Sequence, residues 1–323
     1  MLKTFASVVV AAGAFAAVSA QALDVDPTLK DYKKSAGVEG ALKSVGSDTL
    51  NNLMTLWAED FGKEYPSVRI EIEGKGSGTA PPAMIGGTAQ FGPMSRPMKS
   101  GEIDDFEKKY GYKPTALRVA VDSLAVFVNK DNPIKCLSLT QVDAIFSRSR
   151  KKGGKEDIKT WGQLGLTGEW ASKPISLYGR NSASGTYGYF KEVAMGDGDY
   201  KDSVKEQPGS SAVVQGIASD KFAIGYSGEG YKTADVRTVA LSAKDGATCF
   251  EANAENAYAG DYPITRFLYI YMNAKPGAKP EPLRAEFVKF VLSKKGQMGV
   301  IKDGFYPIPS AIALQDLKLL GLE

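Results

Sequence analysis

The sequence of 323 residues contains no histidine. This absence excludes a Ser-His-Asp or Cys-His catalytic group, a histidine general base and the HExxH zinc motif. Only two cysteines, Cys136 and Cys249, are present, and two thiols without histidine make a poor transition-metal site. We therefore expect no metal, no cofactor and no enzymatic activity, and a binding protein becomes the leading class. Whether the two cysteines are bridged or remain separate thiols stays open, because geometry decides it.

A strong charge of either sign is also missing. The 40 basic side chains nearly balance the 37 acidic ones, which gives a formal net charge of +3. Such a balance provides no large excess of positive charge that would attract nucleic acid. The short basic run at 148–152 is interpreted as a solvated surface loop. We expect no nucleic-acid partner.

Long apolar runs are absent too, because none approaches the length of about 18 residues that a membrane-spanning helix needs. Residues 1–22 have the pattern of a secretory signal instead. Lys3 supplies the charge, residues 5–18 the apolar core, and Ala20-Gln21-Ala22 the small-residue cleavage site. The sequence therefore predicts an exported, soluble protein.

Predicted strands and helices alternate along the mature chain. The helix expected at 49–65 has apolar residues at helical spacing, so one of its faces should be buried. Strands at 41–45 and 68–73 flank it. Such alternation predicts an α/β fold with mainly parallel sheets and helices on both faces. Two apolar strands, at 117–128 and 267–272, are the expected crossings between two lobes.

Three turns rich in glycine, serine and threonine each open a predicted helix. Their sequences are GSDTLNN at 46–52, GKGSGTAPPA at 74–83 and GRNSASGTYGYF at 179–190. A helix start has about four unpaired N–H groups and the positive end of the helix dipole, which together suit an anion. Arg180 in the third turn adds a guanidinium able to grip an oxyanion with two hydrogen bonds. Ligands of α/β sheets lie beyond the carboxyl ends of strands, where all three turns fall.

At this point the chain resembles the periplasmic phosphate-binding proteins, the solute receptors of phosphate ABC transporters. The resemblance spans nearly the whole mature sequence and is carried by five ordered motifs: GSDTL, GSGTAPPA with the following FGPMSR, GRNSASGT, AIGYSGEGY and YPITR. It implies a two-lobed α/β fold of type II, in which each lobe is a mainly parallel sheet flanked by helices. The lobes would comprise 23–120 with 268–323, and 121–267.

The resemblance also implies a function. A monomeric receptor in the periplasm would close on one dry, hydrogen-bonded inorganic phosphate and deliver it to membrane permease subunits. Site residues carry over by motif, with Leu50 acting only through its backbone N–H; they are Thr49, Leu50, Ser77, Arg180, Ser184, Gly185 and Thr186.

Two positions depart from the family pattern. An aspartate that accepts the phosphate proton in the best-known members aligns with Ser95, and a second acidic residue aligns with Ser182. Without that acceptor, a protonated phosphate is hard to distinguish from sulfate. Asp122, within the apolar crossing strand, and Asp48, beside Thr49, are the two candidates for a replacement. Pairing within the hinge is the alternative role for Asp122, and N-capping is the alternative for Asp48.

Three other interpretations of the chain remain. The same fold could bind sulfate or molybdate, or could serve as an extracellular phosphate-binding adhesive or sensory protein. A phosphatase or phosphotransferase would use the Ser184 region as nucleophile, but neither a histidine nor an evident metal cluster is present to activate it.

Overall fold

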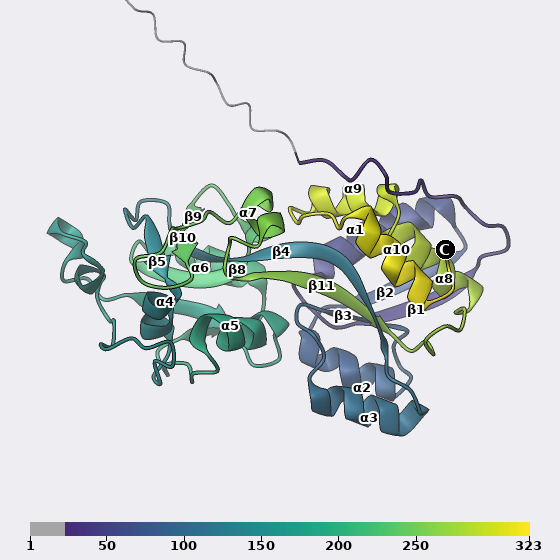
Figure 1. Cartoon of the computed structure of the whole chain (residues 1–323), viewed down its shortest axis with the longest axis horizontal. Helices are drawn as coiled ribbons and strands as arrows, with labels where there is room; N and C mark the ends of the chain where they lie inside the picture. The colour runs from purple at the N-terminus through teal and green to yellow at the C-terminus, as the bar shows by residue number, and fades with distance from the viewer. Residues whose placement is uncertain (1–22) are drawn as a thin grey trace, which may run out of the picture.

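The computed structural model describes residues 23–323, so the secretory signal predicted at 1–22 lies outside the described residues. The described chain forms two lobes joined by two long strands, with the last helices returning to the lobe where the chain began (Figure 1). None of the helices in this part is both long and apolar enough to cross a membrane.

The first lobe combines the two ends of the chain. Its strands β1, β2 and β3 are parallel neighbours, and helices from both chain ends pack around them. The elements are β1 (Gly40–Val45), α1 (Asn51–Glu64), β2 (Val68–Glu73), α2 (Ala80–Ile85), β3 (Phe91–Met94), α3 (Ser100–Tyr110), α8 (Pro282–Val291), α9 (Lys294–Lys302) and α10 (Ser310–Leu319). A short 3-10 turn, η1 (Ser77–Thr79), precedes α2.

The second lobe is formed by the middle of the chain. Strands β8, β6 and β7 are parallel neighbours, while β9 pairs with β4 and the pair β5 and β10 forms a separate small sheet. The elements are β5 (Cys136–Ser138), α4 (Leu139–Phe146), β6 (Ser176–Arg180), α5 (Gly185–Met195), β7 (Lys205–Gln207), α6 (Ser210–Ser219), β8 (Ala223–Gly228), β9 (Val236–Thr238), β10 (Ala240–Ser242) and α7 (Ala254–Ala259). Three 3-10 turns complete it: η2 (Trp161–Leu164), η3 (Gly168–Trp170) and η4 (Glu229–Tyr231).

Two neighbouring strands, β4 (Thr115–Asn129) and β11 (Thr265–Met272), run from one lobe into the other (Figure 1). They are antiparallel to each other, to β3 on one side and to β8 on the other. The result is one mixed sheet in the order β2-β1-β3-β11-β4-β8-β6-β7. The predicted two-lobed α/β fold is confirmed, with parallel strands inside each lobe and antiparallel pairing where the lobes join.

The hydrophobic core is divided at the same two strands. On β4, Val121 still belongs to the core of the first lobe, whereas Leu124 belongs to that of the second. On β11 the first-lobe core begins at Leu268, and Ile264 just before the strand packs in the second lobe. The polar residues between these points, including Asp122 and Arg266, are therefore buried between two separately packed cores.

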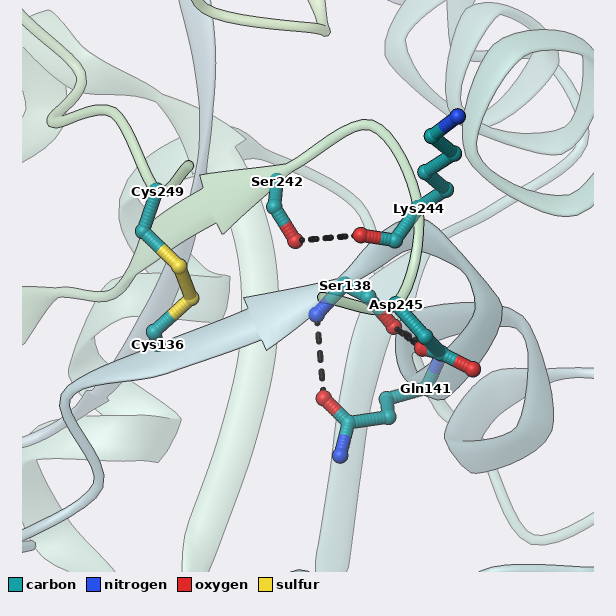
Figure 2. Close-up of a disulfide and its surroundings, with 7 residues drawn as sticks. All are labelled: Cys136, Ser138, Gln141, Ser242, Lys244, Asp245 and Cys249. Carbon is teal, nitrogen blue, oxygen red and sulfur yellow. Dashed lines mark hydrogen bonds between the residues drawn. A yellow bond between two sulfur atoms is a disulfide. The ribbon is translucent and has the colours of Figure 1, made fainter. Parts of the chain in front are cut away.

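Cys136 and Cys249 form a disulfide within the second lobe (Figure 2). Cys136 lies on β5, and Cys249 ends the loop that follows β10. The same loop is also held by Asp245, whose carboxylate accepts a hydrogen bond from the Ser138 hydroxyl at the start of α4. The disulfide and this hydrogen bond tie residues 243–250 to the small β5–β10 sheet.

We expect the double variant Cys136→Ser/Cys249→Ser to lose stability in the second lobe, by up to about 5 kcal/mol in the chain-entropy description of a closed loop with a sequence separation of 113. Urea unfolding followed by the fluorescence of Trp161 and Trp170 would measure it, with Trp57 reporting on the first lobe. Adding a reductant should lower the urea concentration at the unfolding midpoint of the wild type and leave that of the variant unchanged. Equal midpoints for wild type and variant would contradict the expectation.

Candidate anion-binding site

The three turns predicted to bind an anion meet between the lobes. Two of them follow β1 and β2 in the first lobe, and the third joins β6 to α5 in the second. The hydroxyl oxygens of Thr49 and Thr186 lie 2.9 Å apart across the junction. Beside them the Gly78 N–H donates to the Ala183 carbonyl at 2.9 Å. The described arrangement is therefore a closed one, in which the two lobes touch through the predicted turns.

Several hydroxyls at this junction are oriented by fixed donors. The Thr186 N–H donates to Ser184 Oγ at 3.1 Å, Arg266 Nη2 donates to Thr186 Oγ1 at 3.0 Å, and the Ser95 N–H donates to Ser77 Oγ at 3.0 Å. A hydroxyl that accepts such a bond still has its own proton to donate. These side chains are almost completely buried, so hydrogen bonds that they donate would be shielded from solvent.

Backbone donors add to the hydroxyls. The N–H groups of Leu50, Ser77 and Gly185 have no acceptor within residues 23–323. Leu50 precedes α1, Ser77 begins η1 and Gly185 begins α5, so each of the three turns contributes at least one. Because an unpaired buried N–H is costly, three of them at one junction indicate a place for an external acceptor.

Arg180 is buried at the end of β6, and most of its guanidinium nitrogens form hydrogen bonds or an ion pair with other residues of the protein. Nη1 donates to Ser210 Oγ at 2.7 Å, Nη2 donates to the Pro208 carbonyl at 3.2 Å, and Nη2 also lies 3.2 Å from Asp48 Oδ2. Nε has no partner. Burial lowers the pKa of Arg180, and the charge of Asp48 opposes this shift. The sequence predicted that the Arg180 guanidinium would donate two hydrogen bonds to an oxyanion. Both of its Nη atoms already contact protein groups, so Nε is the nitrogen that remains for a ligand.

A second arginine, Arg266, lies at the same junction. It forms an ion pair with Asp122, its register partner on the neighbouring strand: Nε and Nη2 both donate to Asp122 Oδ2, at 3.0 and 2.7 Å. Nη1 donates to the Ser95 carbonyl at 2.7 Å, and Nη2 also reaches Thr186. The other carboxylate oxygen of Asp122, Oδ1, is buried without a partner.

The surroundings of this ion pair are aromatic and poorly solvated. The Arg266 guanidinium lies 5.5 Å from the ring centre of Tyr189, and burial raises the pKa of that tyrosine to about 12. Burial also raises the pKa of Glu229 to about 7, and the nearby charge of Asp122 acts in the same direction. Both shifts indicate a low local dielectric, in which charge-assisted hydrogen bonds are stronger than in water.

The structure brings most of the predicted residues together. The following lie at the junction: Thr49, Leu50, Ser77, Ser95, Asp122, Arg180, Ser184, Gly185 and Thr186. Asp48 does not cap α1, as one interpretation had it; its carboxylate accepts from the Ser210 N–H of the second lobe at 2.8 Å. Within the described range, no cluster of acidic or cysteine side chains could hold a metal ion.

Three residues at the junction were outside the predicted set. Arg266 lies in the YPITR motif but was not among the predicted site residues; it contacts Thr186 and the Ser95 carbonyl. Tyr231 donates to the Thr49 carbonyl at 2.9 Å and lies in the noted AIGYSGEGY motif. Ser210 lies in α6, for which no helix was predicted, so no signal identified it.

Known proteins resemble this chain along most of its length. A family model described as a PBP superfamily domain matches residues 31–295. The phosphate-binding protein PstS of Pseudomonas aeruginosa is 58% identical over 313 residues, which cover 97% of this chain and 96% of the relative. PstS of Staphylococcus epidermidis strain RP62A is 30% identical over 263 residues, covering 80% of this chain and 77% of the relative.

Solved structures show the same architecture. A putative phosphate ABC transporter substrate-binding protein from Clostridium perfringens, solved with bound phosphate, superimposes with a TM-score of 0.69. It is 25% identical, and the match covers 83% of this chain and 100% of that one. An ABC-type phosphate transport receptor from Vibrio cholerae gives a TM-score of 0.64 at 20% identity, over 83% and 100% of the two chains.

We expect Gly185→Ala to hinder closure of the lobes. A Cβ atom at this position would lie 2.3 Å from Ser77 Oγ and 2.6 Å from Ser95 Oγ, both on the opposite lobe. Overpacking of about 1–3 kcal/mol, felt only in the closed state, should weaken binding of the expected oxyanion roughly 10- to 100-fold in a calorimetric titration. Gly101→Ala is the control, because a Cβ there meets nothing within 4 Å. Equal affinities for the two variants would contradict the assignment.

Proposed function

This chain belongs to the PBP superfamily and, within it, to the family of PstS-type phosphate-binding proteins; from that premise we propose that it binds one inorganic phosphate between its lobes. The ligand would be delivered to the membrane permease of a phosphate ABC transporter. The known relatives are phosphate-binding receptors rather than enzymes, and we propose the same for this chain, as a monomer in the periplasm.

The observation that carries this proposal is the polarity of the junction. The turns that meet where the Thr49 hydroxyl contacts the Thr186 hydroxyl contain buried hydroxyls and N–H groups without an acceptor, and Arg180 on the adjoining strand has an unpartnered Nε. A tetrahedral oxyanion needs many donors because each of its ionised oxygens accepts several hydrogen bonds. Neutral donors in a dry site bind such an anion while adding little net charge. The proposed ligand set is Thr49, Leu50, Ser77, Arg180, Ser184, Gly185 and Thr186.

A single acceptor distinguishes phosphate from sulfate. Asp122 Oδ1 is buried and unpaired, while Oδ2 is held by Arg266. We assign Asp122 as the group that accepts the proton of a bound hydrogen phosphate. Fully ionised sulfate has no proton to offer, so it would leave this oxygen unpaired beside a like charge. Ser95, which occupies the family's acidic position, instead bonds Ser47 and Ser77 and shapes the turn.

The function also requires the lobes to move. We place the lobes at 23–120 with 268–323, and at 121–267, because core membership changes close to these points on β4 and β11. Phosphate would settle on the donors of one lobe and be enclosed when the other closes over it, so that the ligand stabilises the closed state. The unpaired acceptor favours phosphate over sulfate or molybdate within the same fold.

Calorimetric titration of the purified, ligand-stripped protein tests the proposal directly: phosphate should bind with one-to-one stoichiometry. Arg180→Ala should then weaken binding on the order of a thousandfold, because it removes a buried positive charge from a buried anion. Ser95→Ala should lose much less, and Arg148→Ala, at an exposed arginine of the same lobe, should lose nothing. If the wild-type protein does not bind phosphate, the proposed function is wrong. If Arg180→Ala and Ser95→Ala lose the same amount of phosphate affinity, the proposed site is wrong.

Asp122→Asn should narrow the preference for phosphate over sulfate by about 10- to 100-fold, because it removes the charge that repels sulfate and weakens the acceptor for the phosphate proton. Competition titrations with both anions at neutral pH would measure the ratio of the phosphate affinity to the sulfate affinity. Asp316→Asn is a matched control, since Asp316 is equally buried and also ion-paired with an arginine, Arg118. An unchanged ratio in Asp122→Asn would assign proton recognition to another group.

A further inference from the structure

Asp48 makes a set of contacts that the ligand site does not require. It belongs to the first lobe, just before Thr49, yet all its side-chain contacts are with the second. Oδ2 accepts the Ser210 N–H at 2.8 Å and lies 3.2 Å from Arg180 Nη2. A carboxylate at this position neutralises the first N–H groups of α6 and the positive end of its dipole.

The fit on the second lobe is close. A Cβ atom on Gly209, the N-cap residue of α6, would lie 3.0 Å from Asp48 Oδ1, so the helix start leaves just enough room for this carboxylate. The main chain beside Asp48 is held from the same lobe, because the Tyr231 hydroxyl donates to the carbonyls of Asp48 and Thr49 at 3.2 and 2.9 Å.

We propose that Asp48 is a closure residue: its carboxylate, docked on the Ser210 N–H and Arg180, stabilises the closed arrangement of the lobes and positions Arg180 for the anion. The proposal rests on the proposed function and deepens it. Asp48 is a positioning residue that does not touch the ligand. It links the arginine that faces the anion to the opposite lobe, so opening the lobes breaks the ion pair that holds that arginine.

The Asp48 charge could affect the rate of phosphate release in two opposite ways, so the sign of the change in a variant tests the proposal. As a neighbour of a bound anion, the carboxylate would repel it, and its removal would slow phosphate release. As a closure residue it stabilises the state that retains phosphate, and its removal would speed release. Asp48 Oδ2 is already paired with the Ser210 N–H and with Arg180 Nη2, so its charge is largely compensated by groups of the second lobe. We therefore expect the closure effect to dominate.

Asp48→Asn should accelerate phosphate dissociation by about 10- to 100-fold in stopped-flow experiments, as expected for the loss of a charged hydrogen bond, with little change in the association rate. Gly209→Ala keeps every charge but crowds the carboxylate, so it should change the dissociation rate in the same direction. Asp60→Asn is the control, because it neutralises an exposed carboxylate on α1 whose partner is the nearby Lys63.

A second measurement does not depend on phosphate. Spin labels at Lys99→Cys and Glu192→Cys, on opposite walls of a groove of about 550 Å³ between the lobes, would report the distance across the mouth of the junction. Without ligand, Asp48→Asn should shift this distance distribution to longer values relative to wild type and Asp60→Asn. This readout remains informative if wild type fails to bind phosphate, so the two proposals can fail separately.

Faster dissociation or a longer ligand-free distance, shared by Asp48→Asn and Gly209→Ala and absent from Asp60→Asn, supports the proposal. Slower dissociation from Asp48→Asn, or no change in either quantity, overturns it. Thermal melts of the three variants show that each is folded at the temperature of measurement.

Discussion

The ion pair between Arg266 and Asp122 is the interaction on which the centre of the molecule depends. It joins the two strands that cross between the lobes, at a point where two separate cores meet. A buried ion pair is stable only when its remaining hydrogen-bonding groups are satisfied. The Arg266 side meets this condition by donating to the Ser95 carbonyl of one lobe and the Thr186 hydroxyl of the other, whereas Asp122 Oδ1 has no partner. The hinge and the candidate site are therefore a single hydrogen-bonded unit.

Much of the fold was predictable from local patterns. Helices α1, α4 and α8 follow apolar spacing, and β4 follows a long apolar run, so burial alone indicates them. Helix α6 was missed because its sequence, SSAVVQGIAS, is small and mixed and suggests a loop as much as a helix. The short apolar run at 238–241 suggests a single strand, but it is divided between β9 and β10, which belong to different sheets. Only long-range packing decides such a division.

The candidate site likewise has parts that local sequence patterns predict and parts that depend on long-range contacts. Ser77, Ser184 and Thr186 belong to turns whose composition indicates anion binding, so the sequence alone predicts them as site residues. The contact of Asp48 with Ser210, and the use of Arg180 by groups other than a ligand, join segments far apart in the chain. No local pattern indicates which of several carboxylates will cross between lobes. The orientation of each hydroxyl likewise became evident only when its donor was located.

The division of the first lobe between the two ends of the chain has a consequence for how the protein reaches its native state. Its core contains Leu42 and Phe91 from the early chain and Leu268 and Phe287 from the late chain. During synthesis, the second lobe is a continuous segment whose core residues all emerge before the first lobe is complete. The first lobe stays incomplete until β11 arrives between β3 and β4. Its early strands would thus leave an edge of the sheet unpaired for most of the time in which the chain is synthesised.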